Sequence, residues 1–142
     1  MATLADCKLA HEVVLLDGKR TLKDSIIDRQ EFECAVPSEF PVVLGCIVRG
    51  SRDETLAFTV DVLSHMERPI GTRTKDVKFE DTGSIEIFME ISIPVLDVRP
   101  CYVLLKFDNV EVWRQRIFFA RPAERLAGSR SAILSPAQQR IG

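Results

Sequence analysis

The chain has 142 residues, of which 46% are hydrophobic and 28% are charged, and its formal net charge is -2. This length is typical of one domain, and such a domain folds without a metal or a disulfide to hold its core. The near-neutral charge argues against a nucleic-acid surface, and no run of about 18 apolar residues is present to cross a membrane. The first ten residues lack the layout of a secretory signal, so we expect a cytoplasmic protein.

The first predicted strand covers residues 8–16 and ends at Asp17-Gly18. This dipeptide favours a tight hairpin turn, because glycine accepts a positive φ. Residues 20–36 are ambiguous: Ile26 and Ile27 are placed to begin a strand, and a short alternation follows around Phe32. The prolines at 37 and 41 then predict a loop, since proline cannot donate to a strand ladder.

The middle of the chain predicts three strands. Residues 42–48 are continuously apolar, as is typical of a central strand covered on both faces. Residues 55–64 and 84–93 alternate strictly between apolar and polar side chains, which indicates half-buried strands. Polar turns are predicted at residues 49–54, 67–74 and 81–83, and residues 94–100 form a connection across one end of the fold.

The last two predicted strands, 102–107 and 110–119, form a hairpin around Asp108-Asn109. This turn places Phe107 opposite Val110, Lys106 opposite Glu111 and Leu105 opposite Val112. Beyond Val112 the apolar residues change to the other face of the strand, which predicts a bulge or a two-faced strand.

Together these patterns predict an all-β fold: an antiparallel sandwich of two sheets with about seven or eight strands, spanning residues 1–120. No helical pattern lies between the strands, so we expect no parallel crossovers. A basic tail, residues 121–142, follows with four arginines and one acidic residue. It is predicted to be flexible or to dock a partner, and the candidate partner-binding residues are Arg125, Arg130, Ile133 and Leu134.

The sequence predicts no catalytic, cofactor-binding or metal-binding residues. Cys7 and His11 are spaced like a zinc pair, but on a strand their side chains lie about 13 Å apart. The cysteines show no C-x-x-C spacing, and we expect free thiols, with Cys34 and Cys46 buried as small hydrophobes. Arg114 and Arg116 alternate with Trp113 and are expected on a solvated outer face.

The order of these signals resembles a family of small bacterial proteins known only as a domain of unknown function. The resemblance rests on Asp17-Gly18, on residues 25–29, on the run PSEFPVVLGCIV at 37–48 and on the closing hairpin, so that it covers residues 5–120. It differs at one place, where Asp24-Ser25 stands in place of a usual glycine. The resemblance implies an immunoglobulin-like sandwich and transfers no catalytic residues.

Three functions remain open. The first is a non-catalytic binding or assembly module that contacts a protein partner or a second copy, through a sheet edge or the tail. The second is a small-ligand-binding protein or enzyme with a pocket among the end loops, in which His65, an acidic residue and a cysteine would converge. The third is a structural subunit of a virion or mobile element. The first is preferred, with no enzyme activity, no nucleic acid and no membrane as expectations.

Overall fold

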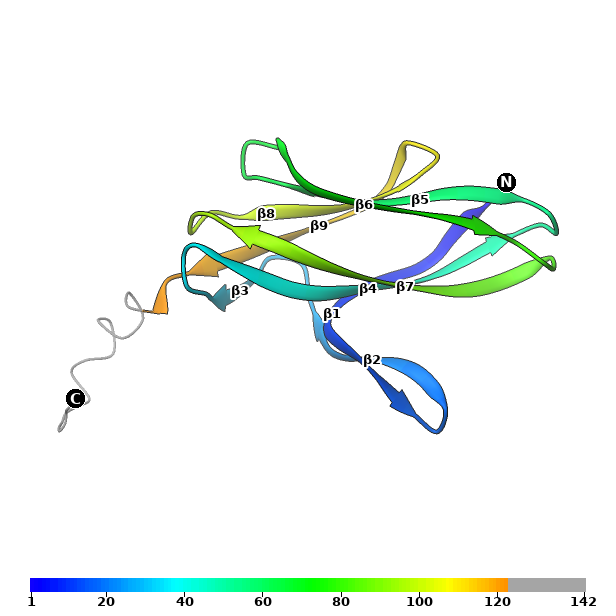
Figure 1. Cartoon of the computed structure of the whole chain (residues 1–142), viewed down its shortest axis with the longest axis horizontal. Coiled ribbons are helices and arrows are strands. Elements are labelled where there is room, and N and C mark those ends of the chain that lie inside the picture. The colour runs from blue at the N-terminus through cyan, green and yellow to red at the C-terminus, as the bar shows by residue number, and fades with distance from the viewer. Residues whose placement is uncertain (123–142) are drawn as a thin grey trace, which may run out of the picture.

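Alternating apolar side chains build two stacked sheets in the computed structural model, which describes residues 1–122 (Figure 1). One sheet has the order β2-β1-β4-β7, formed by Lys19–Ile26, Thr3–Leu16, Ser38–Gly50 and Gly83–Val95. The other has the order β3-β9-β8-β5-β6, formed by Gln30–Glu33, Val110–Ala120, Cys101–Phe107, Thr55–Leu63 and Pro69–Lys78. The predicted all-β, two-sheet sandwich is therefore confirmed, with nine strands within the described residues.

The strand order is that of an immunoglobulin-like sandwich. In such folds strands B and E are neighbours in one sheet, and strands C, F and G follow one another in the other sheet. Here β4 and β7 occupy the first two places, and β5, β8 and β9 occupy the other three. Within residues 1–122, no helix is long and apolar enough to cross a bilayer.

One strand pair departs from the antiparallel prediction. The short strand β3 runs parallel to β9, with Gln30 opposite Ile117 and Glu33 opposite Ala120. Backbone bonds from Arg29 to Arg116 and from Cys34 to Ala120 extend this ladder. No helical crossover was needed to bring these strands together. Instead, the chain passes from one sheet to the other in the few residues between β2 and β3.

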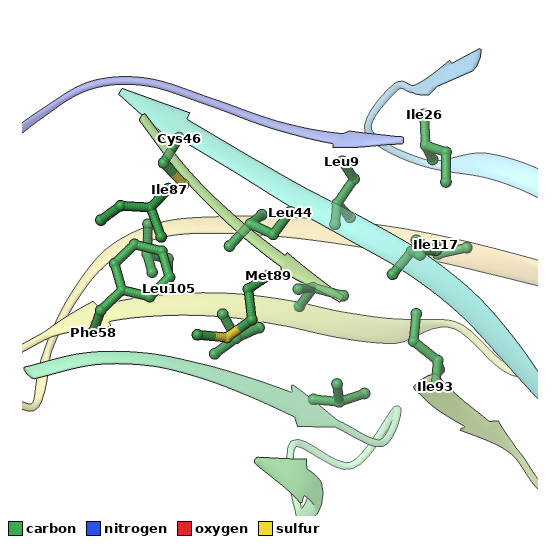
Figure 2. Close-up of a cluster of buried hydrophobic side chains, with 14 of the residues drawn as sticks. Leu9, Ile26, Leu44, Cys46, Phe58, Ile87, Met89, Ile93, Leu105 and Ile117 are labelled. Carbon is green, nitrogen blue, oxygen red and sulfur yellow. The ribbon is translucent and has the colours of Figure 1, made fainter. Parts of the chain in front are cut away.

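The core lies between the two sheets, where the alternating strands meet (Figure 2). Phe58 and Leu105 from the five-stranded sheet face Leu44, Ile87 and Met89 from the four-stranded sheet, and all are at most 4% exposed. The predicted inward faces of residues 55–64 and 84–93 are confirmed by this packing. Burial of these apolar side chains is the main source of stability for the fold.

Two predicted breaks are wrong, because strands run through them. Pro41 lies inside β4 rather than in a loop. It is tolerated because β1 pairs with β4 only as far as Val43, so β4 has β7 as its single partner at Pro41. The predicted turn at 67–74 is mostly strand: the turn closes from Ser64 to Arg68, and Pro69 then begins β6.

The closing hairpin follows the predicted register at its tip and departs from it one pair later. Phe107 lies opposite Val110, and Lys106 lies opposite Glu111, as predicted. A bulge then shifts the ladder, so Leu105 lies opposite Trp113 rather than Val112. This bulge accounts for the change of apolar face in the sequence.

Smaller differences concern single residues. Ile26 ends β2 instead of beginning a strand, and its backbone then turns toward β3. All four cysteines are free, as expected, and Cys46 is buried, but Cys34 is only half-buried. Cys34 still packs against the hydrophobic core, and its thiol lies 3.0 Å from the hydroxyl of Ser38.

Candidate binding surface

The most distinctive feature of the molecule is a bend in β1. Up to Ala10 this strand pairs with β4, and from Leu9 onward it pairs with β2. At the bend the β1–β2 register passes from Ala10–Ser25 to Glu12–Lys23, and Asp24 has a φ of 58°. Residues 11–25, called the arm below, leave the sheet layer and extend beneath β4 and β7 (Figure 1).

Aromatic side chains fix the bend to the sandwich. The ring of His11 meets those of Phe32 and Phe40 edge-on, at centroid distances of 5.1 and 5.7 Å. Phe40 in turn packs against Phe119 at 5.3 Å. These contacts join β1, β3, β4 and β9, so His11 has a packing role. Residues 1–122 hold no cluster of three or more side chains suited to a metal.

Two side chains of β2 reach from the arm to the outer face of the four-stranded sheet. The side chain of Leu22 rests on the backbone of Gly45, where a Cβ would lie 2.8 Å from Leu22 Cδ1. The guanidinium carbon of Arg20 lies 4.6 Å from the ring centroid of Phe88 on β7. Because Gly45 has no side chain, Leu22 lies directly against the backbone of β4.

Between the arm and the sheet lies an open groove of about 760 Å³. Its floor is formed by β4 and β7, and its walls by the first residues of β1 and by β2. Lys8, Lys19 and Arg20 contribute positive charge, and Asp6 and Glu86 contribute negative charge. Within residues 1–122, neither Lys19 nor Arg20 forms an ion pair, and Arg20 stacks on the ring of Phe88.

The tip of the arm carries two exposed leucines. Leu15 and Leu16 are 72% and 58% exposed and lie opposite Arg20 and Lys19. The predicted turn between the strands is confirmed, since Asp17 and Gly18 have φ values of 52° and 78°. Projection from the sandwich, apolar side chains and adjacent cations thus coincide at one place.

The outer face of the five-stranded sheet is different, because its polar groups satisfy one another. Asp61 accepts from Lys106 at 2.8 Å and from Thr72 at 2.7 Å. Burial acts to raise the pKa of Asp61, but these two hydrogen bonds outweigh it and hold the pKa below its usual value. Arg114 binds both Glu111 and Glu67, at 2.9 and 3.0 Å.

The expectation for the residues around Trp113 agrees with this face. Arg114 is exposed and Arg116 half-buried, whereas Trp113 packs against the core. Hydrogen bonds from Arg114 lower the pKa of Glu111. This network of paired charges leaves little for a ligand to bind.

A small pocket of about 190 Å³ lies at the end of the sandwich where β7 leads into β8. His65, Asp97 and Cys101 all line it, which is the convergence expected for a pocket among the end loops. The remaining lining is largely apolar and includes Leu96 and Phe119. Of the three predicted loops, 94–100 contributes most, and 49–54 is absent from the lining.

The thiol in this pocket is poorly set to act as a nucleophile. Burial raises the pKa of Cys101 to about 12, so its thiol is protonated near neutral pH. The Asp97 carboxylate accepts from the Val98 backbone at 2.7 Å and then from Arg99, and its pKa is lowered by the same contacts. A pocket of this volume is also smaller than the range of roughly 300–1,000 Å³ that is common for ligand sites.

The predicted partner-binding residues, Arg125, Arg130, Ile133 and Leu134, lie outside the described residues. The sequence analysis missed the arm and its groove. Four consecutive apolar residues, 13–16, directly before a tight turn were the available signal, because a regular half-buried strand would have alternated there.

Comparison with known proteins yields little. No family model matches the sequence, and no curated protein matches it. Among solved structures, a β-glucuronidase from glycoside hydrolase family 2 is similar with a TM-score of 0.45 and 6% identity. The similarity covers 58% of this chain and 10% of that chain, so the chain spans about a tenth of the enzyme.

Proposed function

We propose that this protein is a non-catalytic binding module that contacts a protein partner through the tip of its arm. The observation that carries the proposal is the pair of exposed leucines, Leu15 and Leu16, on a hairpin that projects from the sandwich. Single exposed leucines are ordinary on protein surfaces, but adjacent ones at a projecting tip favour an interface.

The energetics support a contact of this kind. Burying a leucine side chain contributes about 1.5–3 kcal/mol. Successive side chains of a strand point to opposite faces, so a partner must enclose the tip to cover both leucines. Lys19 and Arg20, which lie opposite the leucines in the hairpin, add positive charge at the rim. Rim charges accelerate association with an acidic partner more than they raise affinity.

Site-specific photo-crosslinking tests the proposal in cells. A photoreactive phenylalanine analogue replaces Leu16 in one variant and Leu96 in a control variant, because Leu96 is 67% exposed in the connection between β7 and β8. The Leu16 position should give a discrete crosslinked product, either with one other protein or with a second copy of the chain. The Leu96 position should not give it.

Charge substitutions provide the matching loss of function. The double variant Leu15→Glu and Leu16→Glu should abolish the product, measured with the crosslinker at Lys19, whereas Leu96→Glu should leave it. Equal crosslinking from positions 16 and 96 would contradict the proposal. A crosslinked product that survives the double substitution would also contradict it.

The second candidate is a small-ligand protein or enzyme that uses the end-loop pocket, favoured by the meeting of His65, Asp97 and Cys101. Alkylation with iodoacetamide at pH 7 distinguishes this candidate function from binding through the arm. A protonated, buried Cys101 should stay unmodified in the folded protein. Rapid alkylation of Cys101 would favour the pocket over the arm as the functional site.

The third candidate function is a structural subunit of a virion or mobile element. The identity of the neighbouring genes would test this assembly role.

A further inference from the structure

Two cysteines far apart in the sequence meet across β1 and β4. Cys7 and Cys46 are direct partners in the strand ladder, and their sulfur atoms lie 3.1 Å apart. Cys46 is 3% exposed and faces the core (Figure 2). Cys7 packs against the same cluster from a half-buried position. Each thiol is therefore the nearest redox partner of the other.

The backbone already holds these residues within reach of a covalent bond. Directly paired residues in an antiparallel ladder have Cα atoms about 4.5–5.5 Å apart. A disulfide accepts Cα separations of about 4.4–6.8 Å. Small rotations of the two side chains therefore suffice to join the sulfur atoms, and the strands need not move apart.

The strand that carries Cys7 lies at an edge. Residues 3–8 of β1 pair with β4 alone, because β2 pairs only from Leu9 onward. Their ladder also contains a register shift between Leu4 and Asp6. Edge segments with one partner open more readily than central strands, so Cys7 is the one of these two thiols that solvent reaches first.

We propose that Cys7 and Cys46 form an oxidation site that closes into a disulfide between β1 and β4. The oxidant is a hydroperoxide. The Cys7 thiolate attacks the peroxide oxygen and becomes a sulfenic acid, and the peroxide leaves as water or an alcohol. The Cys46 thiol then displaces hydroxide from the Cys7 sulfur, which forms the S–S bond and a second molecule of water.

The closed state controls the rate of this reaction. The hydrogen bond with Cys46, together with burial, raises the pKa of Cys7 and keeps its thiol protonated. Oxidation therefore proceeds when residues 3–8 open, and it should be slow while the sheet is closed. Because Asp6 and Lys8 flank Cys7 and line the groove, the disulfide would also fix one groove wall, whether or not the arm binds a partner.

Peptide mapping of the intact, folded protein tests the site. After hydrogen peroxide treatment, free thiols should fall from the four in the sequence to two, with the loss of two hydrogen masses. The new crosslink should join the peptides that contain Cys7 and Cys46, and Cys34 and Cys101 should remain free. The oxidised protein should unfold at a higher urea concentration than the reduced protein.

Two variants serve as controls. Cys7→Ser should prevent the intramolecular crosslink, and Cys34→Ser should leave it unchanged. Peptide mapping of the wild-type protein does not depend on whether a variant folds. It therefore shows by itself whether Cys7 and Cys46 form the disulfide. A disulfide that joins any other pair, or retention of both Cys7 and Cys46 as thiols or as uncoupled sulfinic acids, would overturn the proposal.

Discussion

Asp24 holds an unusual conformation for a residue inside a strand. Its φ of 58° lies in the left-handed region, which costs a residue with a side chain free energy that glycine does not lose. The position falls between the Ala10–Ser25 and Glu12–Lys23 pairs, where the arm leaves the sheet. A glycine there would make the same bend without strain.

Substitution at this position should separate backbone strain from side-chain contacts. Asp24→Gly should leave the free energy of unfolding unchanged or raise it by up to about 1 kcal/mol, because strain is relieved. Asp24→Val should lower it by about 1–2 kcal/mol, since a β-branched residue is least tolerant of positive φ. Urea denaturation of the three proteins measures both effects, and a valine variant as stable as the glycine variant would contradict the assignment of strain.

At the scale of single residues, sequence reasoning succeeded where the local signal was strong. The positive φ at Asp17-Gly18 follows from the turn preference of that dipeptide. It failed at Pro41, because whether a strand tolerates proline depends on how many neighbours it has at that position. That number is a property of the sheet and is not encoded within the strand itself.

At the scale of elements, Asp61 joins three strands of the five-stranded sheet. It lies on β5 and accepts hydrogen bonds from Thr72 on β6 and from Lys106 on β8. Its side chain is 15% exposed, so solvent screens these contacts less than it screens a surface pair. The network therefore contributes to stability in its ionised form.

The lowered pKa of Asp61 makes the free energy of unfolding depend on pH. A carboxyl whose pKa is lower in the folded state stabilises the fold above its unfolded pKa, near 3.8, and loses that contribution as pH falls through the folded pKa. Asp61→Asn should therefore lower the free energy of unfolding by about 1–2 kcal/mol at pH 7 and by much less at pH 3. Urea titrations at both pH values check this.

Asp76→Asn on β6 is the matched control, because Asp76 is exposed and forms no ion pair within residues 1–122. It should change stability little at either pH. If Asp61→Asn cost as much at pH 3 as at pH 7, the charge of Asp61 would not be the stabilising feature.

Alternation identified strands that bury one whole face, and it missed strands that bury only a few side chains. Strands β5 and β7 alternate because their inward side chains fill the core. Strand β6 is an edge strand with a run of five exposed residues, 72–76, so nothing in its pattern distinguishes it from a loop. Its existence depends on pairing with β5, which a sequence pattern does not report.

At the scale of the whole molecule, Gln115 joins the two sheets. It is the one buried polar side chain among the described residues, and its amide nitrogen donates to the Ile26 carbonyl at 2.8 Å. Gln115 belongs to β9 in one sheet, and Ile26 ends β2 in the other. The bond therefore anchors the residue that directly follows the arm to the opposite layer of the sandwich.

Removing this donor should leave a buried carbonyl without a partner. Gln115→Leu should lower the free energy of unfolding by about 1–3 kcal/mol. Gln115→Glu should cost more at pH 7, because a carboxylate would face a carbonyl oxygen, and should recover as pH falls and the acid can donate. Urea denaturation at pH 7 and pH 5, each relative to wild type, measures this. A glutamate variant whose deficit is the same at both values would contradict the role of Gln115 as donor.

The candidate site could not be predicted from the sequence, because its residues meet only in the folded sheet. Leu22, Arg20, Gly45 and Phe88 come from three strands, and only the bend in β1 brings them together. The end-loop pocket was partly foreseen, because loops at one end of a sandwich converge by topology. The arm has no such general rule behind it.

The position of β9 has a consequence for how the protein is made. Although β9 is synthesised after the other described strands, it fills the place between β3 and β8 and supplies Ile117 and Phe119 to the core. A nascent chain that lacks residues 110–120 leaves β3 without a partner and the edge of β8 open to other chains. Productive folding must therefore wait until those residues have left the ribosome, and chaperones that shield strand edges have most to protect in the interval before then.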